Sequence, residues 1–242
     1  MYALLNLYIF LVAAAHAQGD ELYSQYKFGN MFYTGPTKNG VYITKATYSL
    51  ITPETPTGFA TTGGNEELAF WIGVQEDPDG GSVLNENFVQ PLLNWAPNQF
   101  ETGCSANNEE WCITTSTYTP GRQLSEGYKP LTPGSKVDFE ITVADAVTQK
   151  VWVNGVMTSQ QTDSTGMKPE VFYGANECYL QNCGRLEAYT WSNITVVLSA
   201  SDPAFGGTLR FTNSKSDGFE TVDGGRTWTN AGVTIEADNL AF

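Results

Sequence analysis

Apolar and polar residues alternate along most of this chain, and turn-forming residues separate the alternating segments. The segment 136–144 reads KVDFEITVA, and it places Val137, Phe139, Ile141 and Val143 at every second position. A period of two is typical of a β-strand that buries one face. The segment therefore predicts a strand whose other face meets solvent.

Similar runs recur throughout the chain, and none shows a sustained helical period. Asn154-Gly155 follows one of these runs and predicts a tight hairpin turn. With 24 glycines and 11 prolines in the whole chain, the runs predict an all-β fold, an antiparallel two-sheet sandwich or jelly roll. The expected strands are 41–48, 67–74, 87–95, 111–118, 136–144, 150–156, 169–173, 192–199, 207–211 and 233–237.

The N-terminal segment departs from this alternation. Its apolar run covers 3–15 and ends in Ala15-His16-Ala17, the small-x-small pattern of a signal-peptidase site. The run is too short to cross a membrane, which takes roughly 20 apolar residues. We therefore expect a signal peptide at 1–17 and a single secreted, extracellular domain at 18–242 with no membrane contact.

Removing this peptide would also remove His16, the only histidine of the sequence. The mature chain could then use neither a Ser-His-Asp nor a Cys-His catalytic group, nor a His-ligated zinc ion. Carboxylates, amides, hydroxyls or a hard metal ion would remain. The acidic loop 76–81 offers Asp77 and Asp79 for Ca²⁺, but it lacks the EF-hand spacing, so we expect a solvated loop and no metal or cofactor.

The charge balance narrows the range of partners. Twelve Lys and Arg face 26 Asp and Glu, which gives a net charge of −14. Nucleic acid requires a basic surface, so it is not expected as a partner. An acidic medium would relieve the self-repulsion, although acidity can equally serve solubility alone. We expect a monomer.

Two covalent features fit secretion. The sequon Asn-Ile-Thr predicts glycosylation at Asn193, on the outer surface. In an oxidising compartment the four cysteines predict two local disulfides, although four cysteines allow three connectivities. The close pairs are Cys104 with Cys112 and Cys178 with Cys183.

The motif TVDGGRTW at 221–228 matches the Asp-box hairpin of sialidase-type propellers. In those proteins it recurs once per blade, whereas here it occurs once. We therefore expect a structural role, in which Asp223 caps a tight turn and Trp228 packs behind it.

One amide, Gln90, lies inside the apolar run FVQPLLNW at 88–95. A buried amide without hydrogen-bond partners costs about 1–3 kcal/mol. Gln90 is therefore either a structural hydrogen-bonding group or one half of a catalytic pair.

The order of several segments resembles the eqolisins, the glutamic peptidases of fungi. Trp71-Ile72-Gly73 matches their W-(V/I)-G segment, Gln90 their catalytic Gln, Trp111 their substrate-cleft Trp, and Glu177 is the best candidate for the catalytic Glu. The resemblance covers roughly 40–202. The segments, in order, are AFWIGVQ, FVQPLLNW, EEWCITTSTYTP, LTPGSKVDFEITV, VFYGANECYLQNC and AYTWSNITVVLSASD.

The resemblance implies a concanavalin A-like sandwich whose curved sheet forms a cleft, and a secreted acid endopeptidase with a polypeptide substrate. The Glu would activate water as general base and then protonate the leaving amine. The Gln amide would position that water and stabilise the oxyanion. No cofactor is implied.

Three alternatives stay open. Glu170 could align with the catalytic Glu, which would leave Gly174 at the catalytic position. A non-catalytic, lectin-like relative could bind carbohydrate or a cell-wall polymer through aromatic residues on a concave sheet. A glycoside hydrolase could use Glu140 with Glu177. The candidate substrate-binding residues are Trp71, Trp95 and Trp111, whose rings are expected either in the sandwich core or in the cleft wall.

Overall fold

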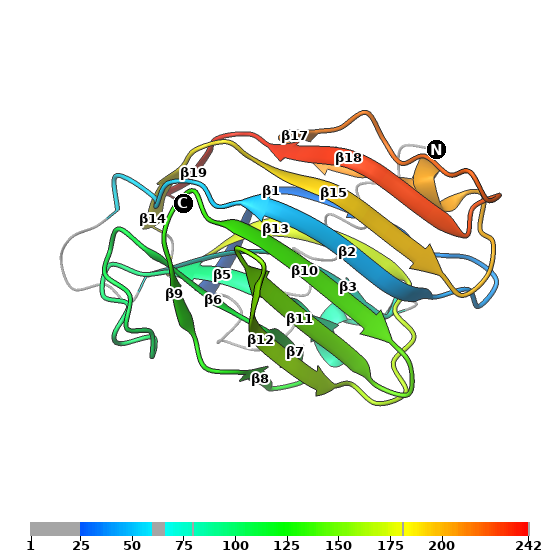
Figure 1. Ribbon diagram of the computed structural model, residues 1–242, viewed down its shortest axis with the longest axis horizontal. Helices are drawn as coiled ribbons and strands as arrows, with labels where there is room; N and C mark the ends of the chain where they lie inside the picture. The colour runs from blue at the N-terminus through cyan, green and yellow to red at the C-terminus, as the bar shows by residue number, and fades with distance from the viewer. Residues whose placement is uncertain (1–24, 60–65, 79, 181, 242) are drawn as a thin grey trace.

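The computed structural model describes residues 25–59, 66–78, 80–180 and 182–241. Antiparallel strands dominate these residues and form two stacked sheets (Figure 1). This arrangement confirms the predicted all-β, two-sheet antiparallel sandwich. The predicted signal peptide, with His16, and Asp79 of the acidic loop lie outside the described residues. No helix in the described ranges is long and apolar enough to cross a membrane.

The first sheet has ten strands and lies at the back in Figure 1. Its main order is β16-β1-β13-β3-β4-β7-β8, while β5 pairs with β3 and β6, and β6 pairs with β9. The bounds are β1 (Tyr26–Thr34), β3 (Glu67–Gln75), β4 (Phe88–Val89), β5 (Leu92–Trp95), β6 (Trp111–Thr114), β7 (Ser116–Thr119), β8 (Arg122–Ser125), β9 (Lys129–Leu131), β13 (Val171–Tyr179) and β16 (Arg210–Thr212).

The second sheet has seven strands in the order β12-β11-β10-β2-β15-β18-β17. A two-stranded ribbon, β14 with β19, and two short 3-10 turns complete the described structure. The bounds are β2 (Ile43–Ile51), β10 (Lys136–Val143), β11 (Val147–Val153), β12 (Val156–Asp163), β15 (Tyr189–Leu198), β17 (Ser214–Lys215), β18 (Thr227–Ile235), β14 (Asn182–Leu186), β19 (Asp238–Ala241), η2 (Val83–Asn85) and η3 (Phe205–Thr208).

The main core lies between the two sheets and is rich in aromatic rings. Tyr48 of β2 stacks on Phe139 of β10, with ring centroids 4.8 Å apart, and meets Trp191 of β15 edge-on. The Tyr48 hydroxyl crosses to the other sheet and donates to the Ile72 carbonyl oxygen at 2.8 Å. Burying each large side chain stabilises the fold by about 1.5–3 kcal/mol, so this layer fixes how the sheets stack.

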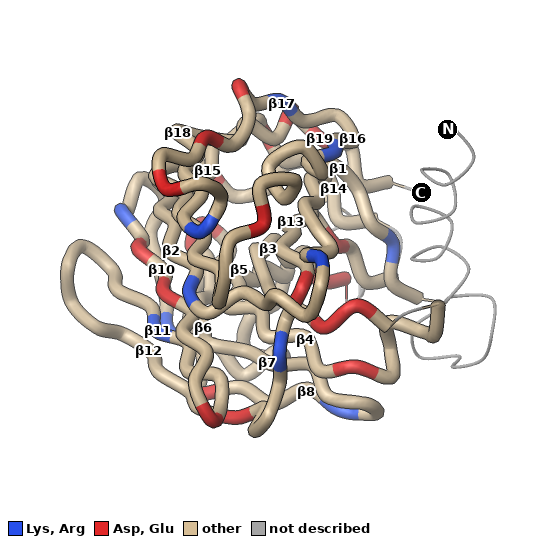
Figure 2. The backbone as a smooth tube through the Cα atoms, turned by 90° about the vertical axis from the view of Figure 1, so that its right-hand side faces the viewer, with Lys and Arg blue, Asp and Glu red and all other residues tan. Residues whose placement is uncertain are grey.

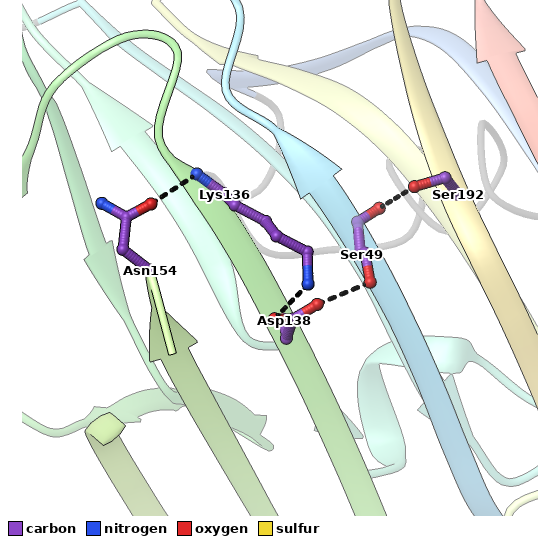
Figure 3. A network of polar contacts seen from close by, with 5 residues as sticks. All are labelled: Ser49, Lys136, Asp138, Asn154 and Ser192. Carbon is purple, nitrogen blue, oxygen red and sulfur yellow. Dashed lines mark hydrogen bonds and ion pairs between the residues drawn. The ribbon is translucent and has the colours of Figure 1, made fainter. Parts of the chain in front are cut away.

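The outer face of the seven-stranded sheet is polar. Asp138 accepts hydrogen bonds from Lys136 Nζ at 2.8 Å and from Ser49 Oγ at 2.7 Å (Figure 3). Next to this network, Glu140 pairs with Lys45 at 2.6 Å and with Lys150 at 3.6 Å. In Figure 2, acidic and basic residues are likewise interspersed along β2, β10 and β11.

Several local predictions are confirmed. The disulfides are Cys104–Cys112 and Cys178–Cys183. Asn154 and Gly155 take positive φ angles of 49° and 82° at the hairpin between β11 and β12. Asn193 is exposed. In the Asp-box turn, Asp223 accepts hydrogen bonds from the backbone N–H groups of Arg226 and Thr227, and Trp228 is buried behind it.

The expected strands differ from the observed ones at several ends, and β1, β9 and β19 are among the strands that were not expected. Three of the differences break or shorten an expected strand. The range 87–95 breaks into β4 and β5 around Gln90 and Pro91, because proline has no N–H to donate to a neighbouring strand. The range 111–118 breaks at Thr115, directly opposite this first break. Most of the range 207–211 belongs to η3 and a connecting residue, so β16 begins only at Arg210.

Candidate functional site

A cavity of about 410 Å³ opens on the face of the ten-stranded sheet that points away from the main core. Neighbouring residues of β3 show this division, since Phe70 and Ile72 belong to the main core while Trp71 belongs to a second apolar cluster. This second cluster forms the cavity floor. Its buried members are Trp71, Phe88, Leu92, Tyr118 and Ala175.

The W-x-G segment explains how the floor is built. Gly73 lies two residues beyond Trp71, and a Cβ placed there would lie 2.3 Å from the Phe88 ring. The glycine therefore lets Phe88 lie flat over β3. Phe88 in turn meets Trp71 edge-on at 4.8 Å and stacks on Tyr173 at 4.7 Å.

Glu177 projects from β13 into this cavity. It lies opposite Ala69 of β3, and its alternation with Ala175 and Tyr173 places all three on the cavity face. The indole N–H of Trp71 donates to Glu177 Oε2 at 2.8 Å. Because neighbouring rings enclose the indole, this hydrogen bond fixes the carboxyl orientation.

The environment of Glu177 changes its acidity. Burial raises the pKa of the Glu177 carboxyl to about 7, the Trp71 N–H opposes this shift, and the nearby charge of Glu67 adds to it. Near neutral pH, both the protonated and the ionised forms are then populated. A group that must accept and then donate a proton needs this property.

Gln90 lines the same cavity from the break between β4 and β5. Its backbone N–H donates to the Ser116 carbonyl oxygen at 2.8 Å, which anchors the irregular position to β7. The side chain is only 7% exposed, and no hydrogen bond from the described residues reaches its Oε1 atom. An unpaired buried amide oxygen costs about 1–3 kcal/mol, so a ligand-binding role would explain why this residue is an amide.

The structure adds two polar residues that the motif order did not identify. Glu67 of β3 lies opposite Tyr179, two positions from Glu177 on the same face, and burial raises its pKa. Asn94 of β5 lies opposite Ala69, and its Nδ2 donates to Glu67 Oε1. The sequence did contain a signal for Glu67. Glu67, Ala69 and Trp71 alternate along one strand, and residues two apart in a strand share a face, so Glu67 could be placed beside Trp71.

Only one of the three candidate substrate-binding tryptophans lines the cavity. Trp71 does so, whereas Trp95 and Trp111 are 1% and 0% exposed in the main core. Trp95 Nε1 donates to the Asn108 carbonyl oxygen, and Trp111 Nε1 donates to that of Pro53. Both indoles are therefore structural groups of the core, and they cannot touch a substrate in the cavity.

The structure separates the other proposed acids from Glu177. Glu140 lies on the outer face of the seven-stranded sheet, so it cannot form a carboxyl pair with Glu177 across a sugar. Glu170 precedes β13 and does not line the cavity. The alternative alignment that uses Glu170 puts Gly174 at the catalytic position, but Gly174 faces Phe32 in the main core. Neither position of that alignment brings an acid into the cavity.

Metal ligands do not converge at this site. Within the described ranges, no group of three His, Cys, Asp or Glu residues could hold a metal ion. Glu76 of the acidic loop instead accepts a hydrogen bond from the backbone N–H of Lys168 at 2.9 Å. The polar side chains that line the cavity carry carboxyl, amide, phenol, hydroxyl and guanidinium groups.

No family model matches the chain, and no curated protein matches it in sequence. Among solved structures, scytalido-glutamic peptidase with a peptide-based transition-state analogue is 11% identical, with coverage of 84% of this chain and 97% of that chain and a TM-score of 0.50. SCP-B, an eqolisin in complex with the tripeptide Ala-Ile-His, is 11% identical, with coverage of 84% and 96% and a TM-score of 0.45. A Bacillus licheniformis β-glucanase is 10% identical, with coverage of 84% and 69% and a TM-score of 0.34. At such identities, the first similarity shows a similar sandwich fold and leaves the activity open.

Proposed function

We propose that this protein is a hydrolase that cleaves peptide bonds in the cavity, with Glu177 as general base and acid and Gln90 as the oxyanion-stabilising amide. One observation supports this above all. A carboxyl on β13 and an amide at the break between β4 and β5 line one cavity; the amide oxygen has no hydrogen-bond partner among the described residues, and the pKa of the carboxyl is raised to about 7.

The proposed reaction begins with ionised Glu177, which removes a proton from water as the water oxygen bonds to the peptide carbonyl carbon. The carbonyl electron pair moves to its oxygen, and the Gln90 amide N–H stabilises that oxyanion. Protonated Glu177 then delivers its proton to the peptide nitrogen as the C–N bond breaks. Trp71 keeps the carboxyl oriented through both steps.

The raised pKa of Glu177 shifts the expected working range away from strong acid. The general base is the ionised form, whose population grows as the pH rises through about 7. We therefore expect kcat/KM to increase from acidic to neutral pH. Two disulfides fit an extracellular setting, and we propose secretion after removal of residues 1–17.

A second candidate function is the binding or cleavage of a glycan. Stacked Phe88 and Tyr173 give the cavity an aromatic wall. Glu67 and Glu177 occupy diagonal positions on neighbouring strands, and residues in such positions lie about 7–8 Å apart. Paired carboxyls of roughly 5–10 Å separation support glycoside hydrolysis.

One experiment separates the two candidates. Wild type, Glu177→Gln and Glu140→Gln are incubated with a denatured protein and, separately, with a β-glucan from pH 3 to 8 in the presence of pepstatin. We expect wild type and Glu140→Gln to cleave the protein equally and Glu177→Gln to lose that activity. Proteolysis that persists in Glu177→Gln would exclude Glu177 as the catalytic acid. Glucan cleavage, or glycan-array binding without proteolysis, would favour the second candidate.

A further inference from the structure

One end of the cavity collects hydrogen-bond acceptors that lack donors. Asn94 is 1% exposed, and its Nδ2 donates to Glu67 Oε1, while Oδ1 is the acceptor atom of the amide. No hydrogen bond from the described part of the chain reaches that buried oxygen. Gln90 Oε1 is unpaired in the same way. The hydrogen bond that Trp71 donates to the Glu177 carboxyl reaches Oε2 and leaves Oε1 for another donor. A ligand that binds here must therefore bring donors.

The positive charge that such carboxyls usually attract is not supplied from within the described chain. The ion pairs of the described residues involve neither Glu67 nor Glu177. Arg122 of β8 is the one basic side chain among the described residues that line the cavity, and it is exposed at the rim. The site can thus gain stability from a cation that comes with a ligand.

Aromatic rings complete this end of the cavity. Tyr26 of β1 packs on Tyr179 of β13, with ring centroids 5.0 Å apart, and Tyr128 lines the same cavity. Burial, and then the charges of Glu177 and Glu67, raise the pKa of the Tyr26 phenol. The two carboxyls therefore lie within electrostatic reach of this ring. Faces of tyrosine rings attract cations, which adds to the attraction of the carboxyls.

We propose that Glu67, Asn94 and Glu177, walled by Tyr26, Tyr128 and Tyr179, form a subsite for an ammonium or guanidinium group of a peptide. An ammonium carries three N–H donors and a guanidinium five, and neither has an acceptor. They therefore match a pocket of unpaired acceptors. The group is supplied either by a Lys or Arg side chain or by the peptide N-terminus. Only the choice of a peptide as carrier rests on the proposed function.

Cation binding should be linked to protonation. A bound cation favours the ionised forms of Glu67 and Glu177, so affinity should increase as the pH rises through about 7 and binding should release protons. The other titratable or charged groups of the cavity are phenols and one guanidinium, and burial raises the pKa of the Tyr26, Tyr128 and Tyr173 phenols. The phenols and the guanidinium belong to Tyr26, Tyr118, Tyr128, Tyr173, Tyr179 and Arg122.

Three short peptides test the proposal by NMR titration of the wild-type protein at pH 8. The first is acetyl-Ala-Lys-Ala-amide, the second replaces Lys with uncharged norleucine, and the third is the norleucine peptide with a free N-terminus. A charge-assisted contact predicts that one cationic peptide binds about tenfold more tightly than the blocked norleucine peptide. The peptide that does so identifies the source of the cation. Equal affinities for all three would overturn the proposal.

Two further measurements locate the preference. Glu67→Gln should reduce the cation preference to about twofold or less, because an amide brings no charge. Glu140→Gln, on the other sheet, should leave it unchanged. A preference that survives Glu67→Gln would contradict the assignment. In the wild-type protein, the cation preference should also shrink at pH 5. A preference at pH 5 as strong as at pH 8 would contradict the proposed subsite, and this measurement does not depend on the folding of a variant.

Binding affinity and hydrolysis are measured in separate experiments, so the two proposals can fail separately. A cation preference in a protein that shows no hydrolysis leaves the subsite standing and removes the proposed peptidase. Hydrolysis that is indifferent to the cation leaves the peptidase standing and removes the subsite.

Discussion

Glu140 and Glu177 are the same residue type on the outer faces of the two sheets, yet their surroundings differ in every respect that matters for acidity. Lys45 and Lys150 flank Glu140, and their hydrogen bonds and charges hold its pKa below the usual value. Glu177 lies among aromatic rings with a second carboxyl nearby, and its pKa is raised to about 7. Both residues are glutamates, so the difference between their pKa values comes from their surroundings. Proton exchange near neutral pH is thus a property of the cavity around Glu177.

The same contrast extends to the neighbours. Around Glu140 the outer face carries Ser49, Lys136 and Asp138 in mutual hydrogen bonds (Figure 3). Around Glu177 two buried amide oxygens, Gln90 Oε1 and Asn94 Oδ1, have no hydrogen-bond partner among the described residues. The network around Glu140 is thus closed within the chain, whereas the cavity keeps two acceptors without donors. Surface ion pairs such as those of Glu140 contribute only about 0–1 kcal/mol.

The largest expected effect comes from removing the two proposed catalytic groups. Gln90→Ala and Glu177→Gln should each lower kcat/KM on a peptide by about 10²–10⁴-fold. The double variant should be scarcely worse than the more damaging single variant, because the two groups act in one step. Steady-state kinetics of the three variants provides the test. If the reduction in kcat/KM of the double variant equalled the product of the two single reductions, the groups would act independently.

The two glutamates should also affect folding stability with opposite pH dependence. Folding raises the pKa of Glu177 from 4.5 to about 7. Between these values the folded protein therefore binds more protons than the unfolded chain, and its free energy of unfolding falls as the pH rises. Compared with wild type, Glu177→Gln should gain at most about 3 kcal/mol between pH 4 and pH 8.

Urea unfolding at several pH values measures this difference. Glu140→Gln is the matched control with the reverse sign. Its native pKa is lowered, so the stability that Glu140 contributes is present above its usual pKa of 4.5 and is lost as the pH falls. If Glu177→Gln tracked wild type at every pH, Glu177 would not titrate differently in the two states.

A smaller effect should follow the loss of one hydrogen bond. Trp71→Phe removes the indole N–H that stabilises the ionised form of Glu177, so the pKa of Glu177 should rise. The midpoint of the pH–kcat/KM profile should move up by roughly one unit. Trp228→Phe removes an indole N–H from the Asp-box turn, away from the cavity, and should leave the midpoint in place. An unmoved midpoint in Trp71→Phe would separate the indole from proton transfer.

The smallest effect is expected on the other sheet. Replacing Lys45 and Lys150 with Met removes both cations from Glu140, so its pKa should rise toward the usual value by less than about one unit, because solvent still reaches the carboxyl. A carboxyl-carbon NMR titration of the double variant detects this change. A pKa that stays low would assign the shift to something other than the lysines.

Much of this contrast could be predicted from the sequence. Alternation in KVDFEITVA identified a strand with one polar face, and the short cysteine separations identified both disulfides. Motif order brought Gln90 and Glu177 to attention, and the structure places both in one cavity. These features are local, or depend only on the period of two in a strand.

Other features depended on tertiary structure. β5 and β6 are buried on both faces, so their sequences do not show which face a tryptophan takes, and Trp95 and Trp111 were candidate substrate-binding residues although they lie in the core. Glu67 shares a face with Trp71 by alternation, but its proximity to Glu177 depends on the register between β3 and β13. That register is set by pairing across more than one hundred residues, which no local pattern encodes.

The most direct measurement is a carboxyl-carbon NMR titration of the wild-type protein, with Glu177 and Glu140 assigned through their Gln variants. The structure predicts that Glu177 titrates near pH 7 and Glu140 below its usual value of 4.5. If Glu177 titrated at or below 4.5, the cavity would not raise its pKa, and acid–base chemistry by this carboxyl near neutral pH would be contradicted.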